Sequence, residues 1–495
     1  MIQIPFDNRY VTLGERFFAR SNPEPVRKPD LIQFNDALAR ELGLATEQVS
    51  AFGADVFSGN SLPEGAEPLA MAYAGHQFGH FVPQLGDGRA LLLGEISSAD
   101  GARYDIHLKG CGRTRFSRDG DGRSALGPVL REYLVSEAMQ KLNVPTTRAL
   151  AAVTTGEPVA RERLLPGGVI TRVASSFVRV GTFEYFAARN DYAAVRQLAD
   201  HVIEKNYPQL GDNEKPYVAF LKAVVERQAA LIAQWMHIGF IHGVMNTDNM
   251  SIAGETIDYG PCAFMDAYQH NQVFSSIDRH GRYAYSNQPS IGLWNLTRLA
   301  EALLPFFDDD PQAAVNLAQE VLGAYSERYE ADWLAGMRAK CGLTACSDAK
   351  GDEDKTLIEA LLDVMADQAA DFTLTFYHLS RMSDQSSEQD NGLRKLFDNS
   401  TRIDAWLETW RRRLRLETQT NDARQQAMQA VNPVYIPRNH QVEAAIRAAE
   451  DRGDFSVFHE LHAVLQNPYV QQKGKERYMQ APEAEEVVEY TFCGT

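Results

Sequence analysis

The sequence has few cysteines, no long apolar run and no N-terminal targeting pattern. Its 495 residues include five cysteines, an odd number. Their spacing fits no zinc site, because Cys341 and Cys346 have no second pair to complete four ligands. No apolar stretch approaches the length of a membrane span, and the first residues, MIQIPFD, lack the charged-then-apolar pattern of a signal peptide. These absences argue against a membrane protein and predict a protein of the reducing cytoplasm.

Basic residues are also fewer than acidic ones. The 66 acidic residues outnumber the 49 lysines and arginines, which gives a net charge of -17 and a pI of about 5.2. Such a surface repels nucleic acids and anionic membranes, so we expect neither as a partner. Arginines that gather in one place would therefore mark a local binding site for an anion.

The composition, with 44% hydrophobic and 23% charged residues, is that of an ordinary globular protein. The length allows two or three domains or one large two-lobed enzyme. In the first half, apolar spacing predicts a helix at 30–42 with Asp30 as N-cap, strands at 104–110 and 169–174, a strand–turn–strand at 147–159 and a helix at 130–139. In the second half it predicts helices at 192–207, 217–238, 290–304, 311–333, 355–379, 401–417 and 439–465.

The most informative stretch is 241–250, IHGVMNTDNM, which is followed at 257–260 by IDYG. Aligned on His242, it has the order and spacing of the protein-kinase catalytic segment, where H-R-D-x-x-x-x-N precedes D-F-G. Asn249 then falls on the metal-binding asparagine and Asp258 on the aspartate that holds magnesium. A carboxylate and a carboxamide, completed by phosphate oxygens, suit the octahedral shell of Mg²⁺.

One position departs from the kinase pattern. Val244 replaces the catalytic aspartate, and valine cannot accept a proton. The nearest carboxylate is Asp248, directly before Asn249. The alternative is that Asp248 and Asn249 cap one turn and that Asp258 begins another. The two segments together, in kinase order and spacing, favour a site for a metal and a nucleotide.

A glycine-containing segment at 84–89, QLGDGR, precedes the strand at 104–110. Its Asp87-Gly88 pair is a strong signal for a tight hairpin. The alternative is a loop over phosphates, where missing side chains let backbone N–H groups approach an anion. Arg89 would add a forked donor suited to phosphate.

Lys109 ends the following strand, as the phosphate-contacting lysine of kinases does, and it could equally be an exposed lysine. Its partner on the next helix would be Glu132 or Glu137, and spacing alone does not decide between them. Arg172 and Arg179 lie in or beside an apolar strand, where an arginine is costly unless it is paired. The partner would be a phosphate or a carboxylate.

Eight segments together resemble the selenoprotein O (YdiU) family, pseudokinases that transfer AMP to protein hydroxyls. They are 75–79 (GHQFG), 84–89 (QLGDGR), 120–123 (GDGR), 145–150 (PTTRAL), 242–250 (HGVMNTDNM), 258–261 (DYGP), 293–296 (LWNL) and 432–433 (NP). The resemblance covers most of the chain.

The resemblance implies an α+β class and a protein-kinase-like bilobal fold that holds ATP in a reversed orientation, with the γ-phosphate buried. The expected parts are an N-terminal extension at 1–60, an N-lobe at 61–185, a helical C-lobe at 186–430 with the catalytic and metal loops, and a C-terminal helical segment and tail at 431–495. We expect a monomer that acts on Ser, Thr or Tyr of protein substrates, with Mg²⁺ or Mn²⁺ as cofactor and ATP, alternatively UTP, as donor.

The resemblance also implies a role for each site residue. It assigns the nucleotide loop to Gly86, Gly88 and Arg89, and the contacts with the inner phosphates to Lys109 (tied to Glu132), Arg172 and Arg179. It assigns further nucleotide contacts to Asp121, Gly122 and Asp258, and metal binding to Asn249 and Asp258. Asp248 would be the proton acceptor.

Two questions stay open at this level. Family members can carry a cysteine or selenocysteine near the C-terminus, where Cys493 stands, but its partner region in some bacterial relatives reads VFSS here, at 273–276. Cys262 as a partner and a free tail thiol are the alternatives. A hydroxyl kinase with Asp248 as base, and a non-catalytic nucleotide-binding scaffold, are the competing functions.

Overall fold

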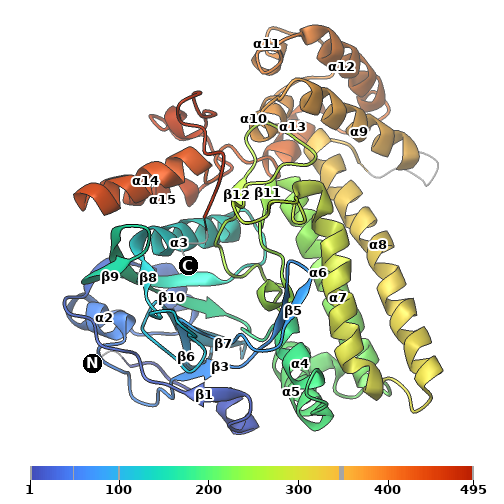
Figure 1. The fold of residues 1–495 in the computed structure, drawn as a ribbon. Helices are drawn as coiled ribbons and strands as arrows, with labels where there is room; N and C mark the ends of the chain where they lie inside the picture. Colours follow the sequence, from blue (N-terminus) through green and yellow to red (C-terminus); the bar gives the residue numbers. More distant parts are fainter. Residues whose placement is uncertain (1–2, 48, 99–100, 345–350, 493–495) are drawn as a thin grey trace.

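The computed structural model describes residues 3–47, 49–98, 101–344 and 351–492, so that Cys346 and Cys493 lie outside the described residues. An antiparallel sheet makes up most of the first part of the chain, and helices make up the rest (Figure 1). This mixture confirms the expected α+β class. The kinase-like division into two lobes stays a prediction.

Most strands of the first part belong to one sheet. They are β1 (Phe18–Arg20), β2 (Asp30–Phe34), β3 (Leu69–Met71), β6 (Ala90–Ser97), β7 (Arg103–Lys109), β8 (Ser124–Ala125), β9 (Arg148–Ala160) and β10 (Leu164–Ala174). The order is β1–β3–β6–β7–β10–β9–β2, and β8 pairs with β10. A separate hairpin consists of β4 (Gly75–Gln77) and β5 (His80–Val82).

The register of the sheet places three basic side chains on one face. Arg172 of β10 pairs directly with His107 of β7, and Lys109 lies two residues further along the same strand. Directly paired residues share a face, and so do residues two apart on one strand. His107, Lys109 and Arg172 therefore point to the same side.

Helix α3 (Leu126–Lys141) lies against β9 and β10. Its other side is covered by α14 (Asn439–Arg452) and α15 (Ser456–Leu465), which come from the far end of the chain (Figure 1). Every side chain from 129 to 139 is buried, as expected for a helix packed on both sides. Two shorter helices, α1 (Asp36–Glu41) and α2 (Val49–Ser58), pack against β9.

The later helices form two apolar cores. The first joins α4 (Val180–Ala187), α5 (Tyr192–Asn206), α6 (Pro216–His237), α7 (Gln288–Leu303) and α8 (Pro311–Cys341). The second joins the end of α8 to α9 (Gly351–Asp367), α10 (Phe372–Leu379), α11 (Asp390–Arg394), α12 (Ser400–Leu414) and α13 (Asn421–Gln429).

A short strand pair holds the central motif. Strands β11 (Phe240–Ile241) and β12 (Ala263–Phe264) are paired, and the loop between them spans 242–262. Within it, the buried His242 bonds through Nε2 to the carbonyl oxygen of Ile257, 2.9 Å away. The end of the loop is tied to the tail, because Thr491 donates from Oγ1 to the carbonyl oxygen of Pro261 at 2.6 Å.

Most of the expected helices are confirmed, including those at 192–207, 217–238, 290–304 and 401–417. The helix expected at 439–465 is wrong as one unit, because Gly453 adopts a left-handed φ of 66° and ends α14. The helix expected at 355–379 is likewise divided before Asp371, which caps α10. Among the described residues, none of the helices combines the length and apolar character that a membrane crossing requires.

Two predictions in the first half are wrong. At 30–42, residues 30–34 pair with β9 as an edge strand, and Asn35, not Asp30, caps the short helix that follows. At 147–159, one continuous strand replaces the expected strand–turn–strand, because β9 pairs with β10 along most of its length. Pairing with a distant strand in the first case, and with the next strand of a hairpin in the second, overrides local apolar spacing.

Candidate active site

A cavity of about 380 Å³ lies between the sheet and the 242–262 loop. Its wall is formed by residues of the β4–β5 hairpin, of the sheet and of the loop. Of the residues predicted for the site it contains Gly88, Arg89, Lys109, Glu132, Arg172, Arg179, Asp248, Asn249 and Asp258. These residues come from segments far apart in the sequence, so the fold brings most of the predicted set together.

Three cations converge on one carboxylate, Asp258. Arg172 Nη1 lies 2.7 Å and Lys109 Nζ 3.3 Å from its Oδ1, and Arg179 Nη1 lies 3.1 Å from its Oδ2. Burial alone would raise the pKa of the Asp258 carboxyl, but Arg179, Lys109 and Arg172 hold that pKa well below its usual value. Asp258 is therefore ionised at neutral pH.

Glu132 is the second anion of this cluster. Its oxygens lie 2.6 Å from Lys109 Nζ and 3.0 Å from Arg172 Nη1. The other glutamate of the helix, Glu137, lies 2.9 Å from Arg148 instead. The described cavity wall as a whole contains more basic side chains than carboxylates: Arg89, Lys109, Arg118, Arg172 and Arg179 against Asp87, Glu132, Asp248 and Asp258. This excess of positive charge suits a polyanionic ligand.

Asp248 lies in a short 3₁₀ turn, Thr247–Asn249, and lines the cavity. Burial raises the pKa of its carboxyl to about 6, although Arg179 lies nearby. Its Oδ2 accepts from Gln77 Nε2 at 3.3 Å, and its Oδ1 is buried without a hydrogen-bond partner among the described residues. A carboxylate that titrates near neutral pH, with one oxygen unused, has the properties of a general base.

The donor atoms at Asn249 and Asp258 fit a divalent cation that brings phosphate with it. Asn249 Nδ2 donates to the carbonyl oxygen of Val244 at 3.0 Å, which leaves its amide oxygen for a ligand. Asp258 Oδ2 is buried and accepts no hydrogen bond in the described part of the chain; its one close partner there is the ion pair with Arg179 at 3.1 Å, which a bound cation would replace. Residues 3–47, 49–98, 101–344 and 351–492 contain no cluster of three His, Cys, Asp or Glu arranged to hold a metal. A cation here would therefore need oxygens from the nucleotide, as Mg²⁺ commonly does.

Three predicted residues do not line the cavity in the described structure: Gly86, Asp121 and Gly122. Asp121 forms an ion pair with Arg161 at 2.8 Å and its side chain is 44% exposed. Gly86 and Gly122 have φ of 96° and 67°, so glycine suits both positions on backbone grounds alone. Their contact with a nucleotide stays a prediction.

Several residues of the site were not predicted from the sequence. His107 Nδ1 lies 2.9 Å from Arg172 Nη2, and His107 Nε2 lies 3.2 Å from Asp87. A guanidinium only donates, so Nδ1 must accept and Nε2 carries the proton. Burial lowers the pKa of this histidine, so it stays neutral and fixes the direction of Arg172.

The hairpin of β4 and β5 lies directly over Asp248. A Cβ at Gly75 would stand 2.9 Å from Asp248 Cβ and closer still to its Oδ1. His76 N–H donates to Thr247 Oγ1 at 2.7 Å. The GHQFG motif drew attention to this segment in the sequence, but the sequence did not show that the segment contacts the loop at Asp248.

We therefore expect Gly75→Ala to lower kcat for the transfer that the resemblance implies about 10²-fold, because the new methyl group must displace Asp248 and an error of about 1 Å in a reacting group costs about that much. The measurement is kcat together with the midpoint of thermal unfolding.

Gly323→Ala is the matched control, since a Cβ at that helical position meets no atom within 4 Å. It should leave kcat unchanged. A Gly75→Ala enzyme with normal kcat would show that Asp248 does not need its present position.

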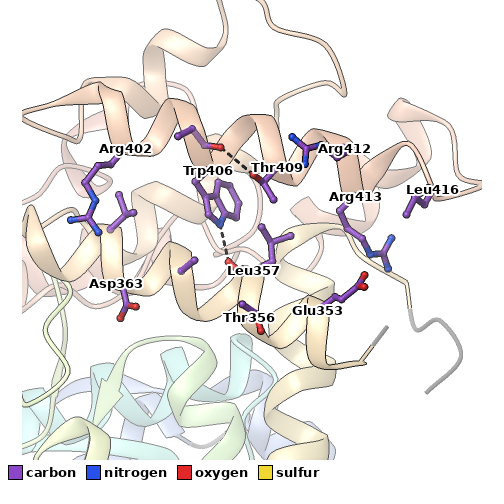
Figure 2. A pocket seen from close by; sticks show the side chains of 13 residues that line it. Glu353, Thr356, Leu357, Asp363, Arg402, Trp406, Thr409, Arg412, Arg413 and Leu416 are labelled. Atoms are coloured by element: carbon purple, nitrogen blue, oxygen red, sulfur yellow. Dashed lines mark hydrogen bonds between the residues drawn. The ribbon is translucent and has the colours of Figure 1, made fainter. Parts of the chain in front are cut away.

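A larger cavity, of about 810 Å³, lies elsewhere, between α9 and α12. Figure 2 shows Trp406 pointing into it, with its indole N–H bonded to the carbonyl oxygen of Leu357 at 2.8 Å. The arginines at its edge include Arg413, which is paired with Asp354 at 2.7 Å. Arg402 at its edge is likewise paired, with Asp367. The cations and carboxylates predicted for the site lie in the smaller cavity, so we assign the chemistry to that one.

Comparisons with known proteins show similarity over the length of the chain. A sequence model of the family described as "Protein adenylyltransferase SelO" matches residues 1–466. Proteins named "Protein nucleotidyltransferase YdiU" are similar to this chain over its full length. The one from Rhizobium johnstonii is 59% identical over 492 residues, 99% of this chain and 97% of that protein. Those from Rhizobium meliloti and Rhodopseudomonas palustris are 58% and 56% identical over 495 residues, all of both chains.

Proposed function

Because this chain belongs to the SelO family of protein adenylyltransferases, we propose that it transfers AMP from ATP to Ser, Thr or Tyr hydroxyls of other proteins and releases pyrophosphate. UTP is an alternative donor. Membership of the family makes the protein a nucleotidyltransferase, whose donor is a nucleoside triphosphate and whose acceptors are proteins. The observation that supports the proposed transfer of AMP from ATP is the convergence of Lys109, Arg172 and Arg179 at one buried point.

The depth of these cations supports a reversed triphosphate. Arg172 and Arg179 are 2% and 3% exposed, so the charge that they neutralise is expected at the inner end of the cavity. A triphosphate with its γ-phosphate innermost would bring the β- and γ-phosphates to these groups. The α-phosphate would then lie further out, toward Asp248 and the acceptor.

Each residue has a part in the proposed transfer. Asp248 accepts the proton of the acceptor hydroxyl, and the oxygen attacks the α-phosphorus. The bond from that phosphorus to the bridging oxygen of the β-phosphate breaks, and the electron pair leaves with pyrophosphate. Lys109, Arg172 and Arg179 stabilise the charge that develops there, a contribution of several kcal/mol in such reactions. Asn249 and Asp258 would hold Mg²⁺ or Mn²⁺, which supplies Lewis-acid stabilisation of phosphate oxygens when bound.

The test uses ATP labelled at the α-phosphate and, separately, at the γ-phosphate, with extract proteins as acceptors. We expect protein-bound label from the α-position only. Label from the γ-position only would identify a kinase with a relocated base, and label from neither would identify a scaffold. Asp258→Ala serves as the inactive control, and UTP labelled at the α-phosphate tests the second donor.

A further inference from the structure

A second cavity, of about 640 Å³, opens beside the proposed nucleotide site. Its wall is formed by Phe78 and by parts of the segment 277–291. Phe78 and Ile277 also line the nucleotide cavity, so the two spaces meet at these two side chains. We call the second space the 277–291 groove.

Phe78 is held firmly at the junction. Its N–H lies 3.1 Å from Asn246 Oδ1 and 3.2 Å from the hydroxyl of Tyr283, and its ring packs on that tyrosine at 5.2 Å between centroids. The residue keeps a left-handed φ of 51°, which a phenylalanine adopts only when its surroundings demand it. Asn246 is two residues from Asp248, so the groove begins next to the proposed base.

The groove carries positive charge that is not neutralised within the described residues. Arg279 is exposed and lines it together with Arg282. In the described ranges neither forms an ion pair with a carboxylate, and Arg282 Nε is buried without a hydrogen-bond partner. The guanidinium of Arg282 is stacked on Trp294, 4.8 Å from the ring centroid, which fixes its position.

Among the described residues that line the groove there is one carboxylate, Asp278, which offsets only part of this charge and is turned into the wall. Asp278 is 5% exposed, and its two oxygens accept the backbone N–H groups of Arg282 and Tyr283 at 2.9 and 2.7 Å. In a chain of net charge -17, such a basic, outward-facing groove is a local exception. Ile277, 52% exposed at the junction, adds an apolar contact point.

We infer that the 277–291 groove docks the segment of the acceptor protein that flanks the modified hydroxyl, and that it selects segments with acidic side chains near that hydroxyl. An acidic side chain would pair with Arg279 and Arg282, while a neighbouring apolar side chain covers Ile277. This inference rests on the proposed function, because the groove matters only if a protein hydroxyl reaches Asp248.

The test compares the wild-type protein with Arg279→Glu and Arg279→Gln in a cell extract supplied with ATP. Mass spectrometry maps the sites that gain AMP. We expect Asp and Glu to be enriched within about five residues of the modified hydroxyls, a distance of about 17 Å in extended chain. For a purified acceptor found in this way, Arg279→Glu should lower kcat/KM about tenfold, with a smaller loss for Arg279→Gln and a KM that rises with salt.

Arg412→Glu on α12 is the matched control, since Arg412 is also exposed but lies at the other cavity. It should leave the sites and kcat/KM unchanged. If the modified sites show no acidic enrichment and Arg279→Glu alters neither the sites nor KM, the docking inference is wrong while the proposed transfer stands. If the wild-type protein attaches AMP to no protein, both the proposed function and the docking inference are wrong.

Discussion

Asp258→Asn is expected to lower nucleotidyl transfer at least about 10³-fold at saturating ATP, because it removes the charged oxygen proposed to hold the metal. Asparagine keeps the size of the side chain, so the loss reports charge. The same change leaves Lys109, Arg172 and Arg179 with one counter-ion fewer. Breaking a buried ion pair from one side typically costs about 3–5 kcal/mol, so the midpoint of thermal unfolding should also fall.

These two effects can be separated by measuring transfer of the α-label below the unfolding midpoint of the variant. A triphosphate would supply the missing negative charge, so ATP should raise that midpoint more for Asp258→Asn than for the wild type. The exposed Asp309→Asn is the control and should change neither quantity. Normal transfer by a folded Asp258→Asn protein would rule out Asp258 as a metal ligand.

Asp248→Asn should lower kcat about 10²- to 10⁴-fold, the usual contribution of a general base, while the Kd for ATP changes less than about threefold. A base works in its ionised form, and burial raises the pKa of Asp248 to about 6. The wild-type kcat should therefore rise with pH through about 6 and level off above it. The variant should lack this rise.

A second variant tests the same assignment through a neighbour. Gln77 donates to the Asp248 carboxylate, and this bond favours the ionised form and lowers the pKa. Gln77→Leu should therefore shift the midpoint of the kcat profile to higher pH. Equal losses in kcat and in ATP affinity for Asp248→Asn would count against its role as base, and an unshifted profile in Gln77→Leu would count against Asp248 as the titrating group.

The loop of the site could be predicted from the sequence because its motif is local. Residues 241–250 and 257–260 carry both proposed metal ligands and the proposed base within a short stretch. The expected groups on the sheet, Lys109 and Arg172, also line the cavity, because strand order and register bring them to one face.

The choice between Glu132 and Glu137 could not be made from the sequence. Five positions apart on a helix, the two side chains point in different directions. The rotation of α3 decides between them, and this rotation is set by packing on β9 and β10 and under α14 and α15. None of those contacts is local in sequence.

The hairpin over Asp248 was missed for the same reason. Gln77 and Asp248 are separated by 171 positions, and neither segment contains a pattern that predicts contact with the other. The strand at 30–34 was mistaken for helix because its apolar spacing fits both structures, and the free edge of β9 determined the outcome.

The cover of α3 has a consequence for the newly made chain. A ribosome completes α3, with Glu132 in it, roughly three hundred residues before it supplies α14 and α15. A nascent chain that ends near residue 430 would hold every side chain assigned to catalysis, yet it would expose the apolar flank of α3 that these two helices shield. Such unprotected surface is what chaperones bind during synthesis. The last helices to emerge would thus determine when the enzyme first becomes competent.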